Sequence, residues 1–462
     1  MIRIRMLSLA LIVACTGAAH AEDLLQVYQL ARNSDPTLAG AQATKLATDE
    51  YVDQARAQLL PQLGINLSYS RTRGGENGSM MVPLDPLDPA QGYVSVNGMT
   101  STSHTRSSSL RLDQSILDIS KWTALKASRY TAQAGAATYD AAQQQLLVGT
   151  AQAYFNVLTA LDALKFADAN EKALARQLEQ AQQRFDVGLA AITDVNDAKA
   201  QHDQAVATVI NNRNAVDTAR ESVRQLTNEE PGEFKHLRED VPLDHPTPDD
   251  PSAWVEVALN HNPSLHAASL NVDAANANVN TARAGHLPTL SGSLTYGRAP
   301  NWGDTEYGGH GSSRNYAGDP KWGSTVMFNL AVPLFSGGYT QSRVRQSIHQ
   351  RDFAQDQFEV GRRQVEAATR NNYRSVIAGA SAVEATRAAV VSAQSSVEAT
   401  QAGYEVGTRT IVDVLISQQT LLQAQSQYSA ARHAFVMNGL LLKQAAGVVE
   451  LKDLEAINAL LE

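Results

Sequence analysis

The chain contains two versions of the same sequence, and this duplication constrains its fold more than any other feature. Residues 184–195 read RFDVGLAAITDV and residues 403–414 read GYEVGTRTIVDV, so that Asp194 of the first segment corresponds to Asp413 of the second. ARAQLLPQL at 55–63 likewise recurs as ARAGHLPTL at 282–290. A 462-residue chain with such a repeat is long enough for two or three domains, or for one elongated structure built from matching halves.

The composition argues against an enzyme. Aromatic residues are only 6% of the chain, which favours long, closely packed helices over an α/β body with thick cores. The 11 histidines form no HExxH motif, and no phosphate-binding loop or nucleophile elbow is present. We therefore predict no catalytic residue, no metal site and no cofactor. The net charge of −9, without a basic patch, also argues against nucleic acid as a partner.

The N-terminal segment 1–21 is typical of a secretory signal peptide. Two arginines precede a short apolar core, and Ala19-His20-Ala21 is a suitable cleavage site. An alternative is a lipoprotein signal ending at Cys15, which would then become the lipidated first residue. Cys15 is the single cysteine, so cleavage after Ala21 leaves a mature chain without disulfides.

The two halves of the mature chain have the same order of elements. We predict a first repeat at 22–227, an acidic, proline-bearing linker or equatorial region at 228–251, and a second repeat at 252–462. Each repeat begins with a helical stretch, expected at about 23–59 and 252–285.

A β-hairpin follows each of these helical stretches. Alternating apolar and polar residues predict paired strands within 64–117 and 289–335, separated by long polar loops at 73–103 and 298–322. Strands of about 8–13 residues suit a tilted crossing of a bilayer, although a soluble β-meander would show the same alternation. No long, unbroken apolar run follows the N-terminal segment, so a membrane crossing would depend on these strands.

Very long helices complete each repeat. Residues 120–185 and 339–405 are free of proline and predict helices of roughly 100 Å. Each is followed by a helix that runs back in the opposite direction, at 193–228 or 410–446. Gly188 and Gly407 stand where a helix is closed by a left-handed residue. The first rod carries a coiled-coil seam, formed by Leu147, Ala151, Tyr154, Leu158 and Leu161. A C-terminal helix ends the second repeat.

Four membrane strands do not close a barrel, and an open sheet edge is not stable in lipid. The barrel must therefore be shared between chains. Three chains supply twelve strands, enough for a water-filled lumen, together with twelve long helices. We predict a mixed α/β membrane protein: a tandem-duplicated protomer of a trimeric 12-stranded β-barrel continuous with a 12-helix α-barrel of long coiled coils.

Several segments resemble the TolC family of outer-membrane channel-tunnels. They include LLQVYQLARNSDP at 24–36, LLPQLG at 59–64, DQSILDISKW at 113–122, TAQAYFNVL at 150–158 and GYEVGTRTIVDVL at 403–415. The resemblance implies a homotrimer in outer-membrane lipid, with its helical part in the periplasm. It also implies an exit duct for a tripartite efflux pump, a type I secretion system or both. Such a duct works with a periplasmic adaptor and an inner-membrane pump of the RND, MFS or ABC type.

The resemblance also implies a gate at the far ends of the long helices. Hydrogen-bonded links between the two helical hairpins hold such channels closed, and one charged pair of the family becomes a pair of glutamines here. The corresponding residues are Thr193, Asp194, Tyr404, Arg409, Gln177 and Gln401. In the alternative interpretation, Asp194 merely favours a helix N-terminus and Arg409 is a solvated surface charge.

Asp413 is predicted to contribute to an acidic ring that binds cations at the narrowest point of the channel. The alternative is that Asp413 closes the helix start with Thr410, and both roles are compatible. The family has a second aspartate one turn later, where this chain has Ile416, so we expect weaker cation block. Asp197 holds the matching position in the first repeat.

The turns between the long helices resemble the adaptor-docking tips of the family. The tip residues are Gly188, Leu189, Gly407 and Thr408, and their plainer role is to close the preceding helices. A competing function for the whole chain is a trimeric, barrel-anchored coiled-coil stalk or adhesin without transport activity. The duplication argues against it, because a stalk needs one terminal anchor rather than two hairpins between helical rods.

Overall fold

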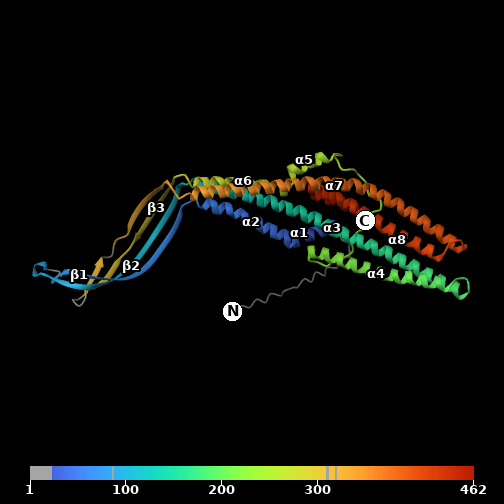
Figure 1. Ribbon diagram of the computed structural model, residues 1–462, viewed down its shortest axis with the longest axis horizontal. Coiled ribbons are helices and arrows are strands. Elements are labelled where there is room, and N and C mark those ends of the chain that lie inside the picture. Colours follow the sequence, from blue (N-terminus) through green and yellow to red (C-terminus); the bar gives the residue numbers. More distant parts are fainter. Residues whose placement is uncertain (1–22, 86–87, 308–311, 318–319) are drawn as a thin grey trace, which may run out of the picture. The chain divides into compact units, whose positions relative to one another are not determined.

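The computed structural model describes residues 23–85, 88–307, 312–317 and 320–462 (Figure 1). The predicted signal peptide, with Cys15, lies outside these residues. The chain divides into two compact units. One consists of the described parts of Met1–Leu46, Ala134–Ser269 and Asp356–Glu462, and the other of Ala47–Gln133 and Leu270–Gln355.

Helices occur in the same order in both repeats, as the duplication predicts. The first repeat has α1 (Leu24–Ser34), α2 (Pro36–Ala57), α3 (Ile119–Asp186) and α4 (Ile192–Thr227). The second has α5 (Pro251–His261), α6 (Pro263–Ala284), α7 (Tyr339–Glu405), α8 (Ile411–Ala445) and the short α9 (Leu451–Asn458). The predicted long helices and their returning partners are confirmed, with ends that differ only slightly from those expected.

The helical stretch predicted at the start of each repeat, at about 23–59 and 252–285, is divided into two helices. Asp35 and Asn262 have extended backbone conformations because a proline follows each of them. Their side chains then start the next helix: Asp35 accepts a hydrogen bond from the Thr37 amide at 2.8 Å, and Asn262 accepts one from the Leu265 amide at 3.1 Å.

The predicted seam of α3 lies in the main hydrophobic core of the larger helical unit. Leu147, Ala151, Tyr154 and Leu158 are all buried. The Tyr154 ring packs edge-on against Phe234 at 5.2 Å, and its hydroxyl donates to the Lys235 carbonyl at 3.1 Å. The segment between the repeats is therefore packed on α3.

A buried polar cluster joins α3 to α8 in the same unit. His433 is only 3% exposed, and its Nδ1 lies 2.8 Å from the Thr159 hydroxyl. Its Nε2 lies 3.8 Å from the Asp162 carboxylate, which also accepts from the Ser429 hydroxyl and lies 3.9 Å from His236. Burial lowers the pKa of His433 to about 4, with repulsion from Arg432 and His236 adding to the effect and Asp162 opposing it.

This pKa makes folding stability depend on pH. Between pH 6.5 and 4, His433 is protonated in the unfolded chain but neutral in the folded protein. The free energy of unfolding therefore falls as the pH drops through this window. The contribution is at most about 3 kcal/mol, at about 1.36 kcal/mol per pKa unit. Denaturant unfolding of the detergent-solubilised protein from pH 7.5 to 4.5 should show a shallower pH slope for His433→Gln, whereas the exposed control His261→Gln should keep the wild-type slope. Equal slopes in all three proteins would contradict this assignment.

The second unit contains one antiparallel sheet. Its strands are β1 (Gln62–Pro83), β2 (Tyr93–Leu117), β3 (Thr289–Arg298), β4 (Asn301–Tyr307), β5 (Ser312–Ala317) and β6 (Gly323–Ala331). Close to the helices the strand order is β1-β2-β3-β6. Farther from the helices, β2 pairs with β4 instead of β3, and β4 pairs with β5. Figure 1 shows β1, β2 and β3 side by side.

β1 and β2 are much longer than the sequence predicted, and the predicted polar loops are largely wrong. β1 has 22 residues and β2 has 25, so most of 73–103 is a two-stranded ladder. β4 and β5 likewise occupy much of 298–322. Serine and threonine suit such a ribbon because they bond across strands, as Ser68 and Ser107 do with hydroxyl oxygens 2.6 Å apart.

The sheet has an apolar face and a polar face. Leu63, Ile65 and Leu67 of β1 are between 66% and 75% exposed, while the residues between them and just beyond are glycine, asparagine and serine. Within the described chain no strand pairs with the outer edge of β1 or β6. The sheet therefore has two open edges beside an uncovered apolar surface.

One helix also has membrane-like composition. An 18-residue window of α7 has a mean hydropathy of 1.3, apolar enough for a membrane-spanning helix by length and composition. The whole helix is 67 residues long. A single helix of this kind is weaker evidence for a membrane than a sheet whose exposed face is apolar.

Candidate functional site

The two long helical hairpins end in turns of the same geometry. Gly188 and Gly407 have φ angles of +77° and +79°, which only glycine adopts readily, as predicted. The amide of the following residue bonds back to the helix in both turns: Leu189 to the Arg184 carbonyl at 2.7 Å, and Thr408 to the Gly403 carbonyl at 2.8 Å. The tip residues Gly188, Leu189, Gly407 and Thr408 are all exposed.

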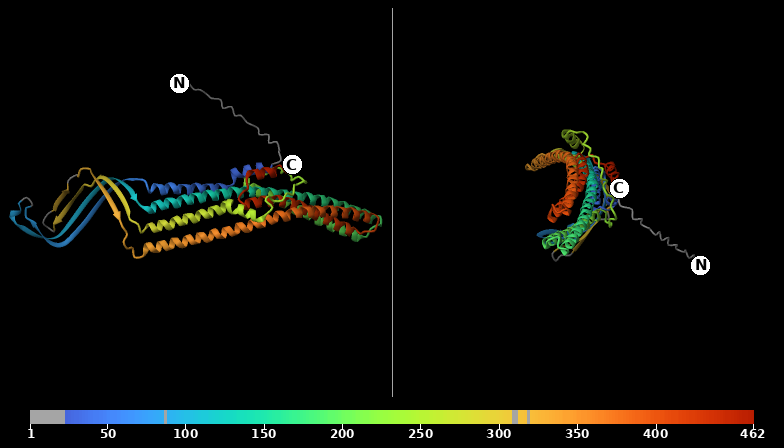
Figure 2. Two further views of the ribbon diagram at one scale, coloured as in Figure 1. Left: turned by 90° about the horizontal axis from the view of Figure 1, so that it is seen from above. Right: turned by 90° about the vertical axis from the view of Figure 1, so that its right-hand side faces the viewer.

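The ends of the hairpins pack against each other in the helical unit (Figure 2). A small buried cluster joins the four helices there, composed of Leu174, Ala205, Tyr404, Ile411, Val414 and Leu415. The helix ends therefore have an apolar contact of their own, separate from the main core.

Tyr404 belongs to this cluster and is only 7% exposed. The guanidinium of Arg184, on α3, lies 4.8 Å from the centre of the Tyr404 ring, within the range of a cation–π contact. The Nε atom of Arg184 is buried and has no hydrogen-bond partner within the described chain. Sequence reasoning missed Arg184, although the duplication offered a signal, because the equivalent residue in the second repeat is Gly403.

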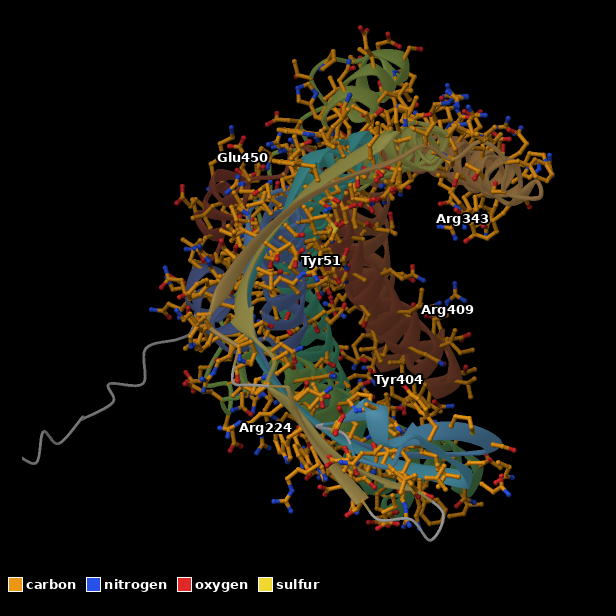
Figure 3. All side chains as sticks on the ribbon, turned by 90° about the vertical axis from the view of Figure 1, so that its left-hand side faces the viewer. Tyr51, Arg224, Arg343, Tyr404, Arg409 and Glu450 are labelled. Carbon is orange, nitrogen blue, oxygen red and sulfur yellow. The ribbon has the colours of Figure 1, made fainter. Side chains whose placement is uncertain are left out.

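Arg409 lies on the same hairpin as Tyr404 but is exposed (Figure 3). A methyl group on Gly403 would stand 2.7 Å from the Arg409 Cγ atom, so Gly403 leaves room for this side chain. Among the described residues, no hydrogen bond or ion pair joins Tyr404 or Arg409 to Thr193 or Asp194. Thr193 is exposed and Asp194 half-buried in the first turn of α4.

The two glutamines do meet. Gln177 of α3 is buried and donates from Nε2 to the Gln401 Oε1 atom of α7 at 2.9 Å. This contact links the two hairpins at a point shortly before their turns. The Gln177 Oε1 atom is buried without a partner in the described chain, so the site retains one unused hydrogen-bond acceptor.

Asp413 makes the helix-capping contacts given as its alternative role. Its carboxylate accepts from the Thr410 amide at 3.0 Å and the Thr410 hydroxyl at 2.9 Å, while the Asp413 amide donates to that hydroxyl oxygen at 3.2 Å. These hydrogen bonds, with a smaller contribution from Arg409, hold the pKa of Asp413 below its usual value. The carboxylate is therefore ionised at neutral pH. Asp197 and Ile416 are both exposed.

Comparison with known proteins agrees with this arrangement. Residues 27–229 and 254–448 match the family described as outer membrane efflux protein. The chain is 38% identical to the outer membrane protein TolC of Escherichia coli (strain K12) over 448 residues, 96% of this chain and 86% of that protein. TolC of Vibrio cholerae is 33% identical over 446 residues, 96% and 95% of the two chains. The crystal structure of the Vibrio cholerae outer membrane protein VceC has the same fold, with a TM-score of 0.74 at 19% identity, over 92% and 96% of the two chains.

The duplicated helical hairpins and strands define a channel protein of the outer membrane, with its helical part in the periplasm. The chain belongs to the outer membrane efflux protein family. The resemblance to TolC and the predicted fold of the single chain are thereby confirmed. The relatives are channel proteins rather than enzymes.

The two hairpins differ in a way that predicts different stability at the turns. α8 begins with a complete capping box, whereas α4 begins after Ala191 and has no side-chain cap. Hydrogen exchange should therefore be faster in the first turn of α4 than in that of α8. Thr410→Ala should remove the difference, and Ala191→Thr, which creates a Thr-x-x-Asp box with Asp194, should slow exchange in α4 several-fold. Unchanged exchange in Ala191→Thr would show that the cap does not limit opening of this turn.

Proposed function

We propose that three copies of this chain form an outer-membrane exit duct for an efflux pump, a type I secretion system or both. The duct is closed at the turns of the helical hairpins and is opened by a periplasmic adaptor and its inner-membrane pump. The observation that carries this proposal is the sheet with two open edges and an exposed apolar face.

An open edge exposes backbone N–H and C=O groups, and each unsatisfied group costs several kcal/mol in lipid. Pairing of β1 in one copy with β6 in the next satisfies both edges. Two copies would make a barrel filled by side chains, whereas three leave a lumen. The polar face, with Asn66, Ser68 and Ser70, then lines water, and the apolar face meets lipid.

The contacts at the hairpin ends support the proposed gate. Gln177 and Gln401 link the hairpins of one chain, and Tyr404 is fixed beside them by packing and by Arg184. Arg409 is exposed and so is available for partners beyond its own hairpin, among which Thr193 and Asp194 are those expected from the family. An arginine can donate two hydrogen bonds to a carboxylate, which makes such a link strong and directional.

The exposed tips supply the surface for an adaptor. Val187, Leu189 and Val406 are 69%, 71% and 75% exposed beside the two glycines of the turns. Apolar side chains next to small residues allow a partner helix to approach closely. A pump of the RND, MFS or ABC type would act through this adaptor.

The first experiment compares single-channel conductance in planar bilayers. We expect a small, cation-selective conductance for the wild type. The double variant Tyr404→Phe/Arg409→Ser should conduct several-fold more, because it loses the hydroxyl and the guanidinium that we propose link the hairpins in the closed channel. Arg387→Ser, which removes an exposed arginine elsewhere on α7, is the matched control and should conduct like the wild type.

Equal conductance in all three proteins would mean that these residues hold no gate. An absence of conductance in every variant would favour the barrel-anchored stalk. The stalk also predicts no dependence of export on the tip residues.

A second experiment tests the proposed cation ring. Three copies of Asp413 would bind a large trivalent cation such as hexaamminecobalt, which then blocks the current from the periplasmic side. We expect weak block in the wild type, none in Asp413→Asn, and block at least about tenfold tighter in Ile416→Asp, which adds a second set of carboxylates. Block that is unchanged in Asp413→Asn would place the cation elsewhere.

A further inference from the structure

The apolar face of the sheet ends at a boundary that both repeats mark with the same residues. Residues 67–71 read LSYSR and residues 294–298 read LTYGR, at the same spacing as ARAQLLPQL and ARAGHLPTL. In each copy a tyrosine is followed, two positions later and so on the same face, by an arginine. Tyr69 and Arg71 lie on β1, and Tyr296 and Arg298 lie on β3.

The strand register places the apolar residues before this boundary on one face. In an antiparallel ladder, residues directly opposite each other share a face. Ile65 is opposite Leu110, which is opposite Tyr296, and Leu294 is opposite Val326. This apolar band begins where the strands leave the helices, and Leu63 and Arg71 are about 26 Å apart along β1 at roughly 3.3 Å per residue. At a strand tilt of about 40°, this length covers roughly 20 Å of the membrane normal, somewhat less than the apolar band of about 25 Å in outer-membrane barrels.

Aromatic rings stack at the end of the band. The Tyr69 hydroxyl lies 2.8 Å from His104 Nδ1, and the His104 and Trp302 rings are stacked at 5.6 Å with an interplanar angle of 11°. Tyr296 stacks on Trp322 at 5.3 Å. Amphipathic aromatic rings in this position are typical of the level at which lipid headgroups begin.

Three arginines follow the same boundary on three neighbouring strands. Arg106 of β2 is directly opposite Tyr69, while Arg71 is opposite His104 and Arg298 is opposite Ser108. From β1 to β2 to β3, each arginine therefore lies two residues closer to the helices than the arginine on the strand before it. The edge of the apolar band also lies closer to the helices on each successive strand, from Tyr69 on β1 to Val326 on β6. The arginines therefore stay at the edge of this band on all three strands.

Two acidic residues lie on the same face beyond this boundary, Asp304 and Glu306. Asp304 shares the apolar face beyond Trp302, and it accepts from Arg314 of β5 at 3.2 Å. Glu306 lies on the same face one pair farther from the helices, opposite Thr100. The Arg298 guanidinium lies 5.7 Å from the centre of the Trp322 ring, while the Arg71 and Arg106 side chains are exposed. Guanidinium groups therefore lie beside aromatic rings at this edge of the apolar face.

We propose that Arg71, Arg106 and Arg298, with the stacked aromatic rings beside them, bind the phosphate groups of a phosphorylated lipid in the outer leaflet. The helices are periplasmic, so the strand ends farthest from them face the outer leaflet. The guanidinium groups match the oxygens of a phosphate, while the acyl chains lie along the apolar band. Diagonal neighbours on adjacent strands are about 7–8 Å apart, so one headgroup with two phosphates reaches more than one arginine. The site rests on the proposed function only in requiring that the apolar face meets lipid.

Binding is tested by native mass spectrometry of the intact protein in detergent, with bis-phosphorylated lipid A as the probe. We expect the wild type to retain this lipid and to bind the dephosphorylated form much more weakly. The triple variant Arg71→Gln/Arg106→Gln/Arg298→Gln should bind phosphorylated lipid A at least about tenfold more weakly, since a hydrogen bond to a charged group contributes a factor of about ten or more. The control Arg213→Gln/Arg224→Gln/Arg387→Gln removes three helical arginines and should bind like the wild type.

Single variants guard against a triple variant that does not fold. Arg71→Gln and Arg106→Gln alter exposed side chains, and each should show part of the loss. The proposal is overturned if phosphorylated and dephosphorylated lipid bind the wild type equally, or if the glutamine variants bind like the control. Displacement of the lipid by millimolar inorganic phosphate would assign the arginines to free phosphate instead. The conductance of each variant is recorded in parallel, so a failed lipid site is distinguished from a failed channel.

Discussion

The requirement that every backbone group in lipid has a hydrogen-bond partner governs this structure. One chain supplies a sheet in which, among the described residues, β1 and β6 each lack a neighbour on one side. Neither edge is protected by a covering helix or strand, which are usual means of shielding an edge in water. The same sheet leaves its leucines and isoleucine exposed along β1. Both features are costly in an isolated chain, and both are relieved when identical sheets join edge to edge within a bilayer.

The helical part faces a different requirement, since its hairpins must hold together without a large core at their ends. At these ends the Tyr404 ring and the Tyr404 hydroxyl have different roles. Packing and the Arg184 guanidinium fix the Tyr404 ring, whereas the Tyr404 hydroxyl is not needed for that packing and is left for polar partners. Replacement by phenylalanine keeps the ring and removes only the hydroxyl. A change in gating in that variant would therefore report a hydrogen bond rather than a collapsed cluster.

The sequence predicted the features that depend on periodicity and on single special residues. Long proline-free stretches became α3 and α7, and Gly188 and Gly407 closed them as expected. The prediction failed where neighbouring strands decide the structure: residues 73–103 are polar enough for a loop, but their ladder with a partner makes them strand. Pro36 and Pro263 each begin a new helix within the predicted helical stretches, a local break that the prediction did not specify. At the site, motifs located Gln177 and Gln401, whereas the contact of Arg184 with Tyr404 depends on packing between distant helices.

The differences between the two repeats explain how a duplicated chain gains a site that neither copy holds alone. Arg184 and Gly403 occupy equivalent positions. The arginine of the first copy extends over the tyrosine of the second, and the glycine of the second leaves space for the Arg409 side chain. Exchanging the two residues would remove the cation–π contact and place a bulky side chain where Arg409 Cγ lies. At the far boundary of the sheet the repeats instead remain alike, since both keep a tyrosine and an arginine two positions apart. Within hairpin ends that are otherwise alike, one divergent pair, Arg184 and Gly403, therefore makes the contact between the two copies.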